Sequence, residues 1–199
     1  MNGGKFRELL DTLGQLIILS VLWMLLTLPL VTAVPATASL YYSVMKAIRK
    51  DLGDPVKEFF RCFGRTWKKG LLHSLLAIIL MGALVLGALT VSSAYWIGAA
   101  AAAVALLYLG PVVSRFELKF WELWGLAFLT GLRSIHWTVL IAAGAVAGAF
   151  AQFYLIPIAA LLILPGAMCL AATFPVEKAM GRAIGGKSKE KQCDAWYDE

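Results

Sequence analysis

The charged residues of this chain gather in four islands, separated by long stretches without Asp, Glu, Lys or Arg. These charge-free stretches contain 34 residues before Lys46, 45 residues before Arg115 and 43 residues before Glu177. A helix needs about 20 apolar residues to cross the ~30 Å hydrocarbon layer of a bilayer. The first stretch therefore holds one span with residues left over, and each of the others holds a helical hairpin. We place five spans at residues 13–33, 71–91, 95–113, 136–152 and 154–174.

The composition supports this interpretation. Of the 199 residues, 60% are apolar and 15% are charged, whereas soluble domains carry about 45–50% and about 25%. This balance argues against a soluble enzyme, a disordered chain and a nucleic-acid-binding module. The predicted fold class is all-α, a polytopic membrane helical bundle. Residues 1–180 form its single domain, and residues 181–199 form a mobile cytoplasmic tail of mixed charge.

Lys and Arg beside the spans predict the orientation. With five spans, 16 basic residues lie on the side of the two long loops and the C-terminus, and two lie on the other side. This asymmetry places the N-terminus outside the plasma membrane and the C-terminus in the cytoplasm. Two alternatives stay open at the first span. It could be a signal peptide cleaved near residues 36–38, or Pro29 and Pro35 could break it into a re-entrant hairpin that leaves both termini cytoplasmic.

Two amphipathic helices are predicted on the cytoplasmic side. Asp54 and Pro55 are typical of a helix start, and aromatic residues then recur on one helical face among bases. A second aromatic and charged helix lies within residues 115–133. Such helices can lie among lipid headgroups, dock in a partner's groove or pack on the protein itself. The contact residues we predict are Phe59, Phe60, Phe63, Trp67, Arg115 and Glu117.

The sequence contains few signs of chemistry. No predicted span contains an ionisable Asp, Glu, Lys or Arg, although proton-coupled carriers normally place such a group at membrane depth. His73 and His136 lack metal-ligand spacing, and the three cysteines form no pair. Phosphate-loop and serine-nucleophile motifs are also missing. We therefore predict no enzymatic activity, no metal and no cofactor. Gly144 and Gly148 suit close helix packing, internally or in a homo-oligomer.

One segment resembles a known family. Residues 28–42, LPLVTAVPATASLYY, followed by Lys46, resemble the characteristic stretch of the YesL-like family of uncharacterised bacterial membrane proteins. The stretches around residues 59–68 and 114–133 resemble its other recurring segments, so the resemblance covers about residues 5 to 180. Val34 departs from the family pattern, which has glycine there, and His136 replaces a proline. The motif residues at the predicted turn and after it are Pro29, Thr32, Pro35, Tyr41 and Tyr42.

The resemblance implies a multi-pass plasma-membrane protein of Gram-positive-type bacteria, encoded beside ABC importers for complex carbohydrates. Our functional hypothesis is a non-catalytic accessory or assembly partner of such an importer. Its expected partners are the lipid bilayer, importer subunits and a second copy of the chain, and no nucleic acid. The alternatives are a transporter or channel for an uncharged solute, with residues 28–36 lining a cavity, or a membrane sensor or regulator.

Overall fold

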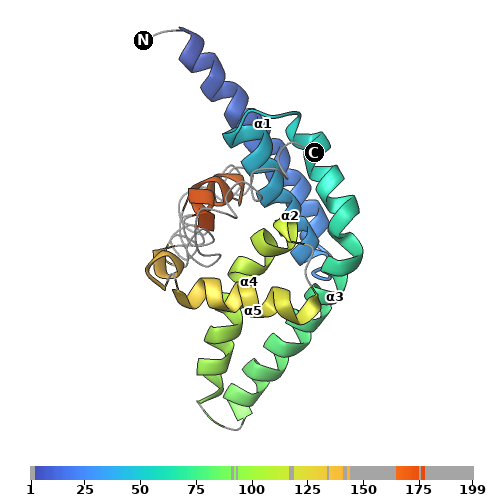
Figure 1. The fold of residues 1–199 in the computed structure, drawn as a ribbon, viewed down its shortest axis with the longest axis vertical. Helices are drawn as coiled ribbons and strands as arrows, with labels where there is room; N and C mark the ends of the chain where they lie inside the picture. Colours follow the sequence, from blue (N-terminus) through green and yellow to red (C-terminus); the bar gives the residue numbers. More distant parts are fainter. Residues whose placement is uncertain are drawn as a thin grey trace.

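The computed structural model describes residues 3–90, 92, 94–116, 119–133, 135–140, 143, 165–174 and 176–177. Within these residues the regular structure is entirely helical. Figure 1 shows the arrangement. The labelled helices are α1 (Gly3–Thr27), α2 (Ala33–Ser43), the π-helix η1 (Val44–Arg49), α3 (Pro55–Thr90), α4 (Tyr95–Arg115) and α5 (Phe120–Arg133).

Three of these helices are long and apolar enough to cross a membrane: Leu10–Thr27 within α1, all of α3, and all of α4. Of the fourth and fifth predicted spans, the structure describes only residues 136–140, 143 and 165–174. Pro165–Phe174 is an apolar helix too short to cross a bilayer by itself. The rest of both spans, the glycine pair at 144 and 148 and the tail at 181–199 lie outside the described residues.

The first predicted span, 13–33, is wrong at its end, because α1 stops at Thr27. Pro29 has no N–H to continue the helix, and its ring pushes the preceding residue out of helical geometry. Leu30 then adopts a positive φ of 52°. The Thr32 hydroxyl donates a hydrogen bond to the Leu26 carbonyl, which satisfies one acceptor that the broken helix leaves free. A helix break thus occurs at residues 28–32, beside Pro29, whereas Pro35 lies inside the following helix and does not break it.

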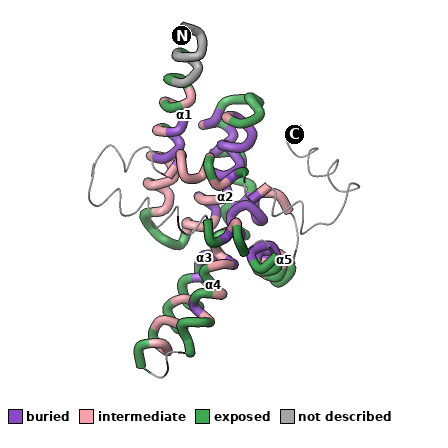
Figure 2. The backbone as a smooth tube through the Cα atoms, turned by 90° about the vertical axis from the view of Figure 1, so that its left-hand side faces the viewer, coloured by how far each residue is buried: buried purple, intermediate pink, exposed green. Residues whose placement is uncertain are grey.

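After the break, α2 and η1 run through the centre of the molecule. Every residue from Ala38 to Ala47 is buried, and α2 packs against α1, α3 and α4. Figure 2 shows the buried residues concentrated around α2, while the far end of the α3–α4 hairpin is exposed. The π-helix is marked by the bond from the Lys50 N–H to the Met45 carbonyl, five residues back. Single π-turns of this kind occur frequently at functional sites.

The start of α3 was predicted correctly, but its length was not. Asp54 Oδ1 accepts hydrogen bonds from the N–H groups of Val56 (2.9 Å) and Lys57 (3.1 Å), as a helix-capping aspartate should. The helix then continues without a break to Thr90. The aromatic-basic segment and the second predicted span are therefore two halves of one helix of 36 residues, not separate elements.

Removal of the Asp54 cap gives a first prediction. Asp54→Ala should lower the free energy of unfolding by about 1 kcal/mol and so destabilise the protein, because two N–H groups lose their acceptor. Asp54→Asn keeps a capping oxygen and is the matched control, expected to stay close to the wild type. The midpoint of thermal unfolding of the detergent-solubilised protein measures both. Equal midpoints for Asp54→Ala and the wild type would contradict the role of this cap.

The apolar helices are offset along the long axis of the molecule. Leu16 and Leu19 of α1 pack in one cluster with Phe59, near the start of α3. The α3–α4 hairpin extends beyond the N-terminal helices at its far end (Figures 1 and 2), where a Cβ on Gly98 would lie 3.1 Å from Leu84. The apolar part of α1 therefore lies beside the aromatic-basic half of α3, and α4 lies beside its apolar half.

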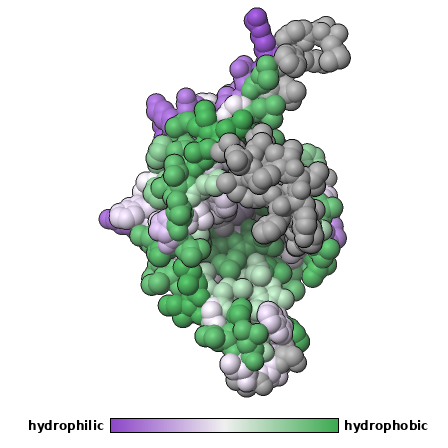
Figure 3. Space-filling model, turned by 180° about the vertical axis from the view of Figure 1, so that it is seen from behind, coloured by the Kyte–Doolittle hydropathy of each residue, from purple (hydrophilic) through white to green (hydrophobic). Residues whose placement is uncertain are grey.

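The surface carries many large apolar side chains. On the α3–α4 hairpin and on α5, which crosses α4 in Figure 1, the most exposed include Leu89 (70%), Ile97 (76%) and Trp121 (77%). In Figure 3 hydrophobic residues cover much of the face seen from behind, and hydrophilic residues gather towards the N-terminal end. Soluble monomers rarely expose contiguous apolar surface of this kind, whereas a bilayer accommodates it.

Candidate functional site: a buried charge network beside a broken helix

The predicted aromatic face of α3 divides between core and surface. Phe59 is fully buried against Leu16, Leu19, Leu40 and Val44. Phe60 and Trp67 are 51% and 42% exposed, and Phe63 is intermediate. Phe59 is therefore a core residue, and its predicted role as a partner contact is wrong. Phe60 and Trp67 remain available for contact with lipid or protein.

A buried ion pair joins η1 to α3. Lys46 Nζ lies 3.4 Å from Glu58 Oε2, and both side chains are only 7% exposed. Two further groups reach this pair: the Tyr42 hydroxyl accepts a hydrogen bond from Lys46 Nζ at 3.3 Å, and Arg61 Nη1 donates to Glu58 Oε1 at 3.1 Å. Because a buried charge is tolerated only when it is paired and hydrogen-bonded, these contacts allow both groups to leave water.

Arginine and aromatic side chains extend the network to α4. Two cations lie near the Tyr42 ring, with Lys46 Nζ at 5.6 Å and the Arg65 guanidinium at 5.7 Å from its centroid. Arg65 also donates to the Ser114 carbonyl at 3.4 Å, near the end of α4. These cation–π contacts tie α2, η1, α3 and α4 together at one level.

Arg115 anchors a second branch. It forms an ion pair with Glu177, and its guanidinium lies 5.7 Å from the centroid of the Tyr41 ring. Arg49 similarly lies 5.1 Å from the Phe174 ring. The structure thus brings Tyr41, Tyr42 and Arg115, all named from the sequence, into one region. Glu117, the other charged residue predicted here, lies outside the described residues.

Pro35 fixes a close helix contact. It is buried, and Gly70 of α3 lies so near that a Cβ at position 70 would be 2.7 Å from Pro35 Cδ. Pro29 and Thr32 form the break itself, as described above. The motif residues thus fall into two groups. Pro29, Thr32 and Pro35 lie at or next to the break, and Tyr41 and Tyr42 lie in the charge network.

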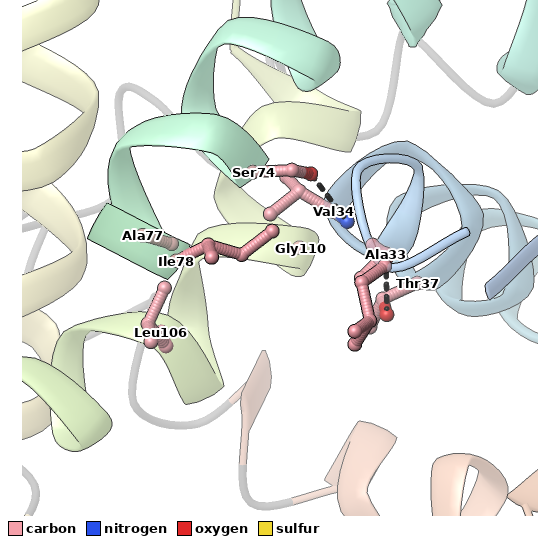
Figure 4. A pocket seen from close by; sticks show the side chains of 9 residues that line it. Ala33, Val34, Thr37, Ser74, Ala77, Ile78, Leu106 and Gly110 are labelled. Atoms are coloured by element: carbon pink, nitrogen blue, oxygen red, sulfur yellow. Dashed lines mark hydrogen bonds between the residues drawn. The ribbon is translucent and has the colours of Figure 1, made fainter. Parts of the chain in front are cut away.

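A pocket of about 270 Å³ lies beside the break, between the start of α2, α3 and α4 (Figure 4). Its wall is mostly aliphatic, with two hydroxyl groups. The lining residues are Leu30, Ala33, Val34, Thr37, Ser74, Ala77, Ile78, Leu106 and Gly110. Residues of the predicted 28–36 segment therefore do line a cavity.

Sequence reasoning missed the buried pair of Lys46 and Glu58. A signal was present, since Lys46 follows Tyr42 by one helical turn and Glu58 is an isolated acid among five bases from 57 to 69. Among the described residues, no group of His, Cys, Asp and Glu is arranged to hold a metal ion. The evident effect of the network is to hold four helical segments together.

An all-helical arrangement with three helices long and apolar enough to cross a bilayer is typical of a helical membrane protein. A family model described as "Protein of unknown function, DUF624" matches residues 16–88. The match runs from the middle of α1 through the break, α2 and η1 to nearly the end of α3, so it includes the ion pair and the contact of Pro35 with Gly70. No curated protein and no solved structure matches the chain.

Proposed function

We propose that this chain is a YesL-like plasma-membrane protein that acts as a non-catalytic accessory or assembly partner of another membrane protein. The matched family is the one to which YesL-like proteins belong, and the resemblance of residues 28–46 supports the narrower label. A carbohydrate ABC importer is the partner that this resemblance implies. We retain five spans, with the first ending at Thr27, and the orientation with the C-terminus in the cytoplasm as part of the proposal.

One observation carries the proposal, namely the outer face of the first half of α3. This face combines the exposed aromatic side chains of Phe60 and Trp67 with the exposed bases Lys57, Arg61 and Lys68. The internal contacts of α3 use the opposite side, through Phe59 and Glu58. Aromatic residues and arginine are enriched at protein interfaces, and Trp and Arg are frequent hot spots of binding energy.

Co-purification of the tagged protein with its partners tests this proposal. The tagged protein is expected to retain importer subunits after crosslinking and purification in a mild detergent. Phe60→Ser combined with Trp67→Ser should reduce this recovery at least ten-fold, since a single hot-spot aromatic contributes about 2 kcal/mol and a ten-fold change needs about 1.4 kcal/mol. Trp121→Ser, which removes a more exposed aromatic from α5, is the matched control. Recovery of the protein alone, or equal loss with the control, would count against the proposal.

A stand-alone transporter for an uncharged solute is the second candidate, supported by the pocket beside the helix break. Broken helices that line a cavity are a recurrent feature of secondary transporters. Under this candidate, liposomes that contain only this protein should pass a neutral solute, and Ala33→Phe should block the passage. Absence of flux in such liposomes would remove this candidate and leave the accessory role untouched.

A further inference from the structure

The pocket beside the break lies at the same depth on two helices. On α3 the pocket residues Ser74, Ala77 and Ile78 begin five positions after Lys69, and on α4 the pocket residue Gly110 lies five positions before Arg115. At 1.5 Å rise per residue, the pocket begins about 7 Å inside the last charge of each helix. In a helix that crosses a bilayer, this depth lies just below the headgroups, where acyl chains begin.

The two hydroxyl groups in the wall are already engaged with protein. Ser74 Oγ accepts the Val34 N–H at 3.0 Å, one of the backbone donors that the start of α2 leaves without a helical partner. Thr37 donates to the Ala33 carbonyl at 2.7 Å and accepts the Trp23 indole N–H at 3.2 Å. Figure 4 shows the bonds of Ser74 and Thr37 directed at α2. The hydroxyl groups of the wall are thus hydrogen-bonded to residues on either side of the helix break, and the remaining surface of the pocket is aliphatic.

The rim of the pocket is also apolar. Leu30 is 64% exposed and Ile78 is 42% exposed, and both line the pocket. Leu75 and Ile79, adjacent on α3, are likewise exposed at 47% and 59%. An occupant therefore enters across apolar side chains, as it would from the hydrocarbon layer and not from water.

We propose that this pocket binds the part of an acyl chain that adjoins its headgroup. Its volume corresponds to about nine groups of the size of a water molecule at ~30 Å³ each, and a methylene group is of similar size. A sugar would bring many hydroxyl groups, each of which needs a partner on burial, and the wall has its two hydroxyls in use. This proposal stands apart from the accessory role and assigns a ligand class to the pocket.

The test measures affinity against chain length. The full-length protein is purified in a steroid-based detergent, which has no alkyl chain, and titrated with saturated fatty acids of about 6 to about 16 carbons. Affinity should rise about four-fold per methylene and then level off near nine or ten carbons. Lysophospholipids with the same chains form a second arm. If both series bind, the chain alone is recognised, and if only the lysophospholipids bind, the source is a membrane lipid.

Two variants make the result specific to this pocket. Leu106→Ala enlarges the cavity and should raise the chain length at which affinity levels off by about two or three carbons. Ala77→Phe fills the cavity and should lower this chain length. Ala83→Phe, at an exposed position of the same helix, is the control for Ala77→Phe and should leave the plateau in place. A plateau that neither variant moves, the absence of any plateau, or displacement of the bound chain by a neutral sugar would overturn the proposal.

Discussion

Glu58→Ala is expected to destabilise the protein by about 3–5 kcal/mol, the usual cost of breaking a buried ion pair by removing one partner. The variant leaves the Lys46 ammonium 7% exposed and without its carboxylate. The Tyr42 hydroxyl remains near Lys46, but a neutral oxygen does not replace the lost charge. The helical junction of η1 with α3 should therefore loosen, and the fraction of protein that elutes as a folded, monodisperse species should fall sharply.

Two further variants separate the ion pair from nonspecific damage. Arg61→Ala removes the half-exposed partner of Glu58 and should cost at most about 1 kcal/mol, because solvent screens that contact. Lys46→Met combined with Glu58→Leu replaces both charges with apolar side chains and should recover most of the lost stability. Thermal unfolding followed by gel filtration measures all four proteins. If Glu58→Ala unfolds at the same temperature as Arg61→Ala, the pair does not stabilise the fold as argued.

Hydropathy was sufficient to identify α4 and the second half of α3 as apolar helices, and the capping pattern of Asp54 and Pro55 identified the start of α3. Hydropathy was not sufficient to predict how the helices are offset along the long axis of the molecule. The charge-free stretch before Lys46 specifies that residues 13–33 avoid water, but it does not specify that α1 lies beside Phe59 and not beside the apolar half of α3. That offset depends on packing between helices, such as the fit of Pro35 on Gly70.

The candidate site shows the same limit. Phe59 and Phe60 are neighbours in sequence, about 100° apart around the helix, and periodicity alone did not decide which of them faces inward. The burial of Lys46 and Glu58 was harder to predict, because hydropathy scales assign charged residues to positions exposed to water. Only the partner, 12 residues away across a loop, makes burial of each group tolerable.

Gly70→Ala is expected to destabilise the protein by about 1–3 kcal/mol, the usual cost of overpacking a buried contact. The added Cβ would lie 2.7 Å from Pro35 Cδ and 2.8 Å from Pro35 Cβ. A flexible side chain could turn away, but the pyrrolidine ring is rigid, so α2 and α3 must separate. Since Val34 and Ser74 adjoin this contact and hydrogen-bond across the same helix pair, the separation should also disturb the pocket.

The chain offers a close control for this substitution. Gly64 lies on the same helix with no atom near the position of its Cβ, so Gly64→Ala should be neutral or more stable by about 0.5–1 kcal/mol, because alanine favours the helix. Pro35→Ala introduced together with Gly70→Ala removes the ring atoms and should recover part of the loss. A thermal midpoint for Gly70→Ala equal to that of Gly64→Ala would show that the two helices can separate freely. The break at residues 28–32 would then have no rigid support on α3, and the pocket beside it would have no fixed wall.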